Sequence, residues 1–94
     1  MEEHLSIKDI HDRLQELPGW EMPSHTEIAK EFEFANFKEA ADFVQKVGEE
    51  AERQHHYPDI LIRNNRVLLT LTTPEEGGLT YKDFKLAKII EQLV

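Results

Sequence analysis

The sequence predicts an α+β fold, a two-layer sandwich in which three helices pack on one face of a four-stranded antiparallel sheet. Three segments carry apolar residues at helical spacing, and two pairs of extended segments lie between them. Pro and Gly occur singly or in pairs at the ends of these segments, without a repeat or a low-complexity tract. We therefore expect one domain over residues 1–94, with the element order α-β-β-α-β-β-α.

The first part of the chain is expected to form a helix followed by two strands. Ser6 is a suitable N-cap for a helix over residues 5–17, and the Pro-Gly pair that follows would end it. Residues 20–22 are predicted to form a short strand before a proline. Residues 27–34 are predicted to form a longer strand, because their apolar side chains alternate with outward-facing glutamates.

A second helix is expected in the middle of the chain. Asn36 and Glu39 have the spacing of a capping pair. An apolar stripe at helical spacing then consists of Phe37, Ala40, Val44, Val47 and Ala51. This helix leads into the run "ERQHHYPD", residues 52–59, and Pro58 is expected to close it, because the residue before a proline disfavours the helical conformation.

Residues 60–63 and 66–73 are predicted to form a β-hairpin around the two-residue turn Asn64-Asn65, since asparagine tolerates a positive φ. This turn pairs Leu61 with Leu68 on the outer face of the sheet. The inner face of the hairpin gathers Ile60, Ile62, Val67, Leu69 and Leu71. An exposed apolar pair on the outer face favours self-association.

The last helix is expected to begin at a capping pair formed by Thr80 and Asp83. Its apolar stripe consists of Phe84, Ala87, Ile90 and Leu93. The hairpin register also brings the loop "TTPEEGG", residues 72–78, next to His55 and His56. We expect the two histidines and this loop to border one pocket.

The composition argues against several classes of function. The chain has 11 basic and 19 acidic residues and a net charge of −8, which is the wrong sign for direct binding to nucleic acid or to an anionic membrane. It has no cysteine, which excludes disulfides, thiolate catalysis and cysteine zinc sites. The N-terminus lacks a targeting pattern, and no apolar segment approaches the roughly 20 residues that cross a bilayer. A soluble, cytoplasmic protein is expected.

The run "ERQHHYPD" admits three interpretations. His55, His56 and Tyr57 at a helix end can cap carbonyl groups and pack on the sheet. Glu52, His55 and His56 share a helix face and could bind zinc, but the run lacks a fourth ligand. Alternatively, a histidine here is an acid or a base, since imidazole titrates near neutral pH.

Three runs together resemble one known family. "AERQHHYPDILIRNNRVLLTLTT", "GGLTYKDFKLAKIIEQL" and "FEFANFKEAADFV" are similar to pterin-4a-carbinolamine dehydratases over residues 17–93. The resemblance implies the predicted fold and a lyase activity without metal or cofactor. The family's enzymes eliminate water from a 4a-hydroxytetrahydropterin and give the quinonoid dihydropterin in tetrahydrobiopterin recycling. It also implies a homodimer or homotetramer.

The resemblance assigns roles to individual residues. The family pattern is matched at Glu52, His56, Pro58 and Asp83. The resemblance implies that His56 is the acid or base, that Glu52 orients His56 and that Asp83 completes the catalytic set. Two family histidines are replaced here by Tyr57 and Pro74, and His55 stands where the family usually has asparagine, aspartate or glycine. The substrate-binding residues implied are His55, Tyr57, Pro58, Thr72, Thr73, Pro74 and Glu75.

Two functions follow from this partial match. The first is a working dehydratase, favoured by Asp83, by the Thr-Thr pair and by the runs "PDI" and "GGLT". The second is a protein of the same fold that has lost its chemistry and acts as a protein-binding or assembly factor, favoured by Tyr57 and Pro74. We expect the first.

Overall fold

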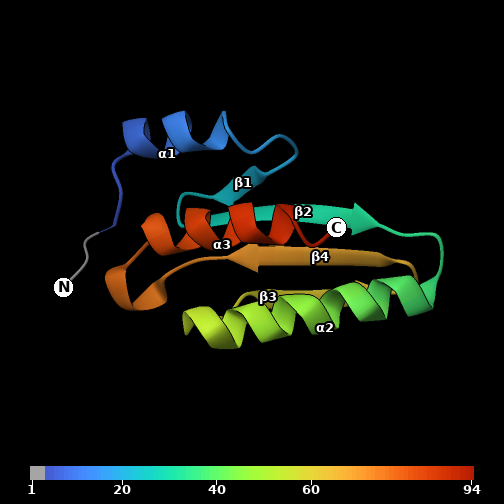
Figure 1. Cartoon of the computed structure of the whole chain (residues 1–94). Coiled ribbons are helices and arrows are strands. Elements are labelled where there is room, and N and C mark those ends of the chain that lie inside the picture. Colours follow the sequence, from blue (N-terminus) through green and yellow to red (C-terminus); the bar gives the residue numbers. More distant parts are fainter. Residues whose placement is uncertain (1–3) are drawn as a thin grey trace.

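The structure, a computed structural model, describes residues 4–94. Its elements are α1 (Ile7–Leu14), β1 (Glu21–Ser24), β2 (Glu27–Glu33), α2 (Phe37–Gln54), β3 (Asp59–Arg63), β4 (Arg66–Leu71), the 3-10 helix η1 (Pro74–Glu76) and α3 (Tyr81–Glu91). The four strands form one antiparallel sheet in the order β1-β2-β4-β3 (Figure 1). The predicted α+β class and element order are confirmed, and η1 is an addition.

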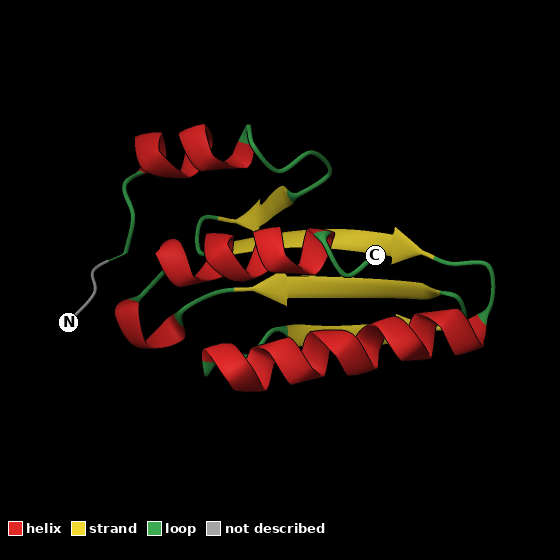
Figure 2. Ribbon diagram, in the orientation of Figure 1, coloured by secondary structure: helices red, strands yellow, loops and turns green. Residues whose placement is uncertain are grey.

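The molecule has two layers. Helices α2 and α3 lie side by side across one face of the sheet, and α1 lies next to β1 at the edge of the sheet (Figures 1 and 2). The opposite face carries no helix of the described part of the chain. Within residues 4–94, none of the helices combines the length and the apolar character needed to cross a membrane.

The predicted hairpin register is confirmed. Asn64 adopts a positive φ of 56°, and Leu61 lies opposite Leu68 in the β3–β4 ladder. Strand β4 ends at Leu71 rather than at Thr73, because the chain bends toward η1 and Thr73 pairs only with Gly78 in an isolated bridge. The face expected to be buried is fully buried on the central strand β4 and only partly buried on the edge strand β3.

The first helix is shorter than predicted. Ser6 caps it as expected and accepts a hydrogen bond from the backbone N–H of Asp9, but the helix ends at Leu14 and the chain continues in turns. Strand β1 runs through Pro23 instead of stopping before it. An edge strand tolerates proline, because one side of its backbone has no neighbouring strand to bond.

Helix α2 begins as predicted, with the Asn36 side chain accepting a hydrogen bond from the backbone N–H of Glu39. Its buried stripe differs from the predicted one at two positions, because Phe37 is 55% exposed and Val44 is half-buried, and Phe43 is buried in addition. A first-turn residue lies beyond the end of the neighbouring strands, whereas Phe43 packs against Phe32 and Phe34 with ring centroids 5.0 and 4.9 Å apart.

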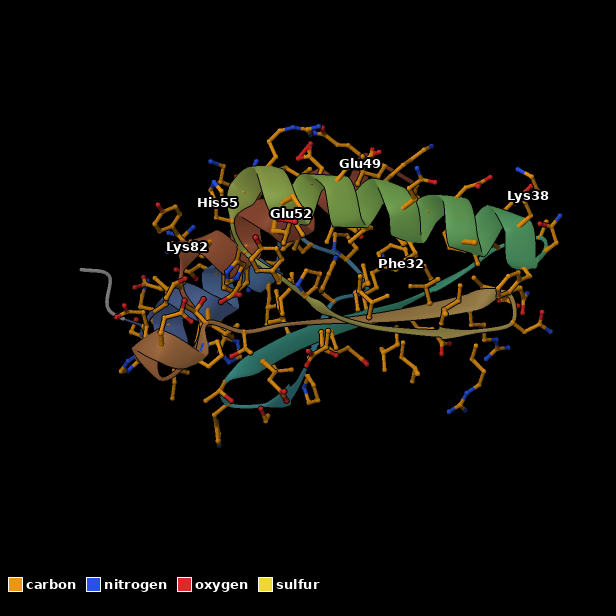
Figure 3. All side chains as sticks on the ribbon, turned by 90° about the horizontal axis from the view of Figure 1, so that it is seen from below. Phe32, Lys38, Glu49, Glu52, His55 and Lys82 are labelled. Atoms are coloured by element: carbon orange, nitrogen blue, oxygen red, sulfur yellow. The ribbon has the colours of Figure 1, made fainter. Side chains whose placement is uncertain are left out.

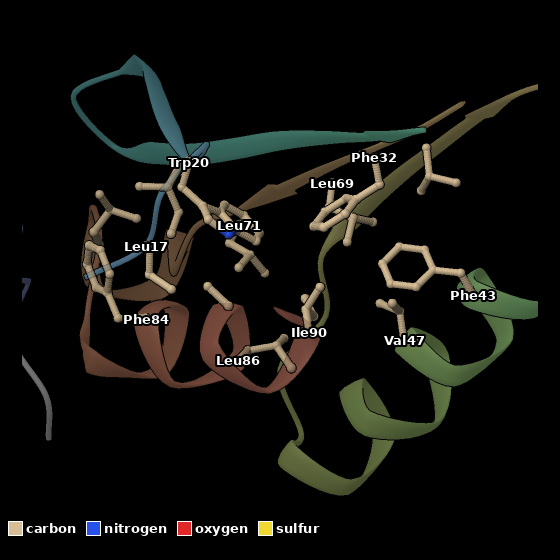
Figure 4. Packing of buried hydrophobic residues seen from close by; sticks show 14 of the residues in the cluster. Leu17, Trp20, Phe32, Phe43, Val47, Leu69, Leu71, Phe84, Leu86 and Ile90 are labelled. Carbon is tan, nitrogen blue, oxygen red and sulfur yellow. The ribbon is translucent and has the colours of Figure 1, made fainter. Parts of the chain in front are cut away.

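The core lies between the sheet and the two long helices (Figure 4). Leu69 and Leu71 of β4 face Leu86 and Ile90 of α3 (Figure 4), and Val67 of β4 is fully buried like them. Each such side chain contributes about 1.5–3 kcal/mol relative to an exposed one. Because β4 is central and both long helices rest on it, the end of β4 is held firmly where the chain turns toward η1.

Glu91 joins the end of α3 to the start of the sheet. Its Oε2 atom accepts hydrogen bonds from Trp20 Nε1 at 2.9 Å and from Lys30 Nζ at 2.8 Å. Lys30 also donates to the carbonyl of Pro18. Gly19 has a positive φ of 89°, and a Cβ there would lie 2.9 Å from the Lys30 side chain, so the turn before β1 requires glycine.

We predict that Glu91→Ala lowers the free energy of unfolding by about 1–3 kcal/mol, because Trp20 Nε1 loses its acceptor in a partly buried position. Urea denaturation followed by tryptophan fluorescence measures the change. The control is Glu31→Ala on the exposed face of β2, for which we expect a change within about 0.5 kcal/mol. Equal losses in the two variants would contradict a specific role for Glu91.

Candidate functional site

The centre of the candidate site is a buried pair formed by His56 and Asp83. The Nε2 atom of His56 lies 2.6 Å from Oδ1 of Asp83. The histidine is 6% exposed and the aspartate 0% exposed. The two residues are 27 positions apart, and the fold brings the end of α2 to the start of α3.

Asp83 is held by a chain of hydrogen bonds with a defined direction. Its Oδ2 atom accepts from Thr73 Oγ1 at 2.8 Å and from the backbone N–H of Thr80 at 3.0 Å. Since Thr73 uses its one proton on Asp83, its oxygen must accept the hydrogen bond from Thr80 Oγ1 at 2.9 Å. Thr80 Oγ1 in turn accepts the backbone N–H of Lys82. Every partner therefore donates toward Asp83, as a carboxylate requires.

A helix end of the Schellman type positions His56. His55 adopts the left-handed conformation with φ 52°, and its N–H bonds to the carbonyl of Glu52. The N–H of His56 bonds to the carbonyl of Ala51 at 3.1 Å. These two bonds define the motif, whose left-handed residue is usually glycine. Helix α2 therefore ends at Gln54, before the left-handed His55, and is not closed by Pro58 as the sequence predicted.

The hydrogen bond to Asp83 fixes the role of each ring nitrogen in His56. Because a carboxylate only accepts, Nε2 must carry a proton. Among the described residues, no buried side-chain nitrogen or oxygen lacks a partner, and the structure records no hydrogen bond to Nδ1. Nδ1 therefore opens onto the surface, where a pocket of about 100 Å³ is lined by Gln54, His56, Tyr81, Lys82 and Lys85.

Glu52 contacts Tyr57 instead of His56. The Tyr57 hydroxyl donates to Oε2 of Glu52 at 2.8 Å, and the tyrosine is 60% exposed. This hydrogen bond, partial burial and repulsion by the Glu52 charge raise the pKa of the Tyr57 phenol. Asp83, and not Glu52 as expected, makes the contact that orients His56. The left-handed turn at His55 rotates the residues after it away from the helix face of Glu52.

The remaining predicted site residues are spread around this centre. Figure 3 shows Glu52, His55 and Lys82 at the same end of the molecule, where α2 ends and α3 begins. Thr73 lies behind Asp83, in the buried network. His55 is exposed. The lining of the pocket at His56 contains neither His55 nor any residue of the loop 72–78, so the pocket expected between the histidines and this loop is not the one that the structure forms.

Pro58 and Thr72 are half-buried, and Pro74 and Glu75 are exposed on η1. Within residues 4–94, no three or more side chains of the types that bind metals come together. Sequence reasoning did not select Gln54, Tyr81, Lys82 or Lys85 for the site. The spacing of the two lysines on either side of Asp83 is the signal that would have pointed to them, because residues three apart share a helix face.

The chain matches one protein family over nearly its whole length. The family model described as "Pterin 4 alpha carbinolamine dehydratase" matches residues 3–93. A protein of Acidobacterium capsulatum named "Putative pterin-4-alpha-carbinolamine dehydratase" is 49% identical over 90 residues, which are 96% of this chain and 97% of that protein. A protein of the same name from Sulfolobus acidocaldarius is 42% identical over 89 residues, with coverage of 95% and 97%.

Two solved structures share the fold. A crystal structure described as "transcriptional coactivator/pterin dehydratase from Brucella Melitensis" has a TM-score of 0.91 at 30% identity, covering 96% of this chain and 97% of that one. A pterin dehydratase-like protein described as a RuBisCO assembly factor in the alpha-carboxysome has a TM-score of 0.68 at 18% identity, with coverage of 80% and 88%. At that identity the second likeness concerns the fold alone.

Fold and site together define an α+β protein of the pterin dehydratase type, with a buried histidine–aspartate pair at a helix junction. The sequence matches make the assignment specific: the chain belongs to the pterin-4-alpha-carbinolamine dehydratase family.

We predict that Glu52→Ala lowers the pKa of the Tyr57 phenol toward its ordinary value of 10.0, because the acceptor and its charge are removed. Ultraviolet titration of tyrosine ionisation measures the change, in a Tyr81→Phe background so that Tyr57 alone contributes. The control is Glu49→Ala, one turn earlier on α2.

The sign of the pH effect follows from the raised pKa. The contribution of this hydrogen bond to stability is present below the ordinary tyrosine pKa and is lost as the pH rises through the raised one. We expect the free energy of unfolding of the parent protein to fall as the pH rises through this pKa, and we expect Glu52→Ala to lack this fall. An unchanged Tyr57 titration in Glu52→Ala would show that the two side chains are not paired in solution.

Proposed function

We propose that this protein is a 4a-hydroxytetrahydropterin dehydratase in which His56 transfers both protons of the reaction. The observation that carries the proposal is the His56–Asp83 pair, with Nε2 of the imidazole bound to a buried carboxylate and Nδ1 open to a pocket. Family membership supplies the reaction class. The structure adds a single imidazole, that of His56, whose orientation is fixed by the hydrogen bond from Nε2 to Asp83.

The chemistry can be written for one histidine. Protonated His56 donates from Nδ1 to the hydroxyl on carbon 4a, and the lone pair of the adjacent ring nitrogen expels water. The carbon–oxygen bond breaks and a carbon–nitrogen double bond forms, which leaves that nitrogen positively charged. Neutral His56 then takes the proton from the nitrogen through Nδ1 and is ready for another turnover.

Geometry allows one imidazole to serve both steps. The departing oxygen and the ring nitrogen are bonded to the same carbon, so a small shift of the substrate presents either atom to Nδ1. The Asp83 carboxylate stabilises the imidazolium and holds the ring through Nε2, in the way that an orienting aspartate supports a catalytic histidine. Asp83 and Thr73 are positioning residues in this proposal, since Asp83 acts through His56 and Thr73 through Asp83.

The proposed substrate-binding surface extends from the pocket toward the residues implied by family resemblance. Tyr57, Pro58 and His55 follow the end of α2, and Thr72, Pro74 and Glu75 lie on the chain leaving β4. Tyr57 is engaged by Glu52, and proline has no proton to transfer, so neither replaces the histidine that the family pattern has at its position. We therefore propose a slow enzyme, since each missing acid or base reduces the rate by roughly 10² to 10⁴.

We predict that His56→Gln reduces the dehydration rate of 4a-hydroxytetrahydropterin to that of buffer, measured by stopped-flow absorbance as the quinonoid product forms. Glutamine retains a polar group near Asp83 but cannot exchange protons at neutral pH. The control is His11→Gln on the exposed face of α1. Circular dichroism verifies that both variants fold.

Two further variants sharpen the assay. Asp83→Asn is expected to lower kcat without removing substrate binding, because the imidazole loses its orienting charge. Tyr57→His with Pro74→His is expected to raise the rate, because both family histidines are restored. A native rate equal to buffer, unaffected by His56→Gln, would exclude the dehydratase function.

A protein-binding function is the second candidate. The observation that favours it is the apolar surface left exposed: Tyr57 is 60% exposed at the end of α2 and Leu61 is 50% exposed on the outer face of the sheet. Exposed aromatic and apolar side chains of this kind are typical of binding surfaces. This candidate predicts that pterin dehydration is absent while partner binding survives His56→Gln.

We also propose that the protein is a homo-oligomer, a dimer or a tetramer, that associates through β3. This strand is at the edge of the sheet and has one side without a neighbouring strand. Antiparallel pairing of two copies about Leu61 would place Asp59 of one copy opposite Arg63 of the other. The pairing is self-complementary in charge and buries the exposed leucine at its centre.

We predict that Leu61→Lys converts the oligomer into a monomer, because two lysines would face each other on the symmetry axis. Size-exclusion chromatography with light scattering measures the mass. The control is Gln45→Lys, which adds the same charge on the exposed side of α2. A native protein that is already monomeric, or a Leu61→Lys variant that remains oligomeric, would contradict this interface.

A further inference from the structure

Gln54 lines the pocket beside His56, together with Tyr81 and two lysines of α3. It is half-buried, and within residues 4–94 the structure records no hydrogen bond to its side-chain amide. A primary amide presents an N–H donor and a carbonyl acceptor side by side, whereas an ammonium group only donates and a phenol does both at one oxygen. Among the described lining residues, Gln54 alone therefore matches a ligand edge on which a donor stands next to an acceptor.

The end of α2 holds Gln54 in a fixed relation to His56. Gln54 is the last residue of the helix, and His55 after it adopts the left-handed conformation. The N–H groups of His55 and His56 bond to the carbonyls of Glu52 and Ala51, which fixes the turn. One turn thus brings the amide-bearing residue and the imidazole to the same pocket, two positions apart in the chain.

The pterin ring has a complementary edge next to its reacting carbon. In a 4a-hydroxytetrahydropterin, carbon 4a is bonded both to the ring nitrogen that loses its proton and to the carbonyl carbon at position 4. The N–H at position 3 follows that carbonyl, so an acceptor and a donor stand side by side. Pockets that enclose a whole small-molecule ligand are about 300–1,000 Å³, whereas this one is about 100 Å³. It can therefore receive this edge of the ring and not the whole ring.

We propose that the Gln54 side chain binds this edge of the substrate, with its N–H donating to the carbonyl at position 4 and its oxygen accepting the N–H at position 3. Paired amide contacts of this kind also recognise the edges of heterocyclic bases in nucleic acids. The inference rests on the proposed dehydratase function and narrows the substrate to pteridines with a carbonyl at position 4 and an unsubstituted nitrogen 3. Gln54 determines specificity and takes no part in proton transfer.

Isothermal titration calorimetry with two matched ligands tests the proposal. 6-Methylpterin and 3,6-dimethylpterin differ only by a methyl group on nitrogen 3, which removes the donor. We expect the native protein to bind 6-methylpterin about tenfold more tightly, as the loss of two neutral hydrogen bonds predicts. Gln54→Leu should bind the two ligands equally, because leucine has no polar group to distinguish them. The matched control Gln45→Leu, on the exposed side of α2, should retain the preference.

The kinetics of dehydration give a second measurement. Gln54→Leu should raise KM about tenfold and change kcat much less, because the contact exists in the ground state and in the transition state alike. Circular dichroism verifies that both variants fold. A preference that survives Gln54→Leu, or equal affinities in the native protein, would overturn this inference and leave the dehydratase proposal intact. If neither pterin binds the native protein, the dehydratase proposal and this inference both fail.

Discussion

The burial of the Asp83 carboxylate is the constraint on which the rest of the site depends. A buried carboxylate without partners is strongly unfavourable, so its oxygens must be satisfied by groups that donate. The donors come from three segments: His56 after α2, Thr73 after β4 and Thr80 before α3. These donors hold the three segments together at Asp83, and the same carboxylate holds the imidazole of His56.

A common helix start thereby becomes part of a chemical site. In the capping box of α3, Asp83 uses only Oδ2 to accept the backbone N–H of Thr80. Its other oxygen, Oδ1, is left for the imidazole of His56. Placing a buried polar pair in this position brings little net stability, since desolvation offsets much of the attraction. The proposed proton transfer by His56 is therefore a better physical reason for the pair than stability, which well-packed apolar side chains would provide.

The sequence predicted those structural features that depend on residues close together in the chain. The hairpin register follows from the two-residue period and from the tolerance of Asn64 for a positive φ, and the helix starts follow from capping pairs. The end of α2 did not follow, because a Schellman motif is expected at glycine and here His55 occupies its left-handed position. The family's usual asparagine, aspartate or glycine at this position was the available signal, since these residues tolerate that conformation.

The same turn explains why the contact of Glu52 was not predictable. In a continuous helix His56 would lie one turn after Glu52 and on the same face. The left-handed His55 between them breaks the helical period, so Glu52 accepts a hydrogen bond from Tyr57 instead. Tyr57 bonds to Glu52 at the surface, and the imidazole of His56 points inward and bonds to Asp83. Tyr57, where the family resemblance implies a histidine, bonds to Glu52, while the neighbouring His56 bonds to Asp83. Under the proposed function, a site can therefore lack one proton-transferring group and still hold the other, because the His56–Asp83 contact does not involve Tyr57.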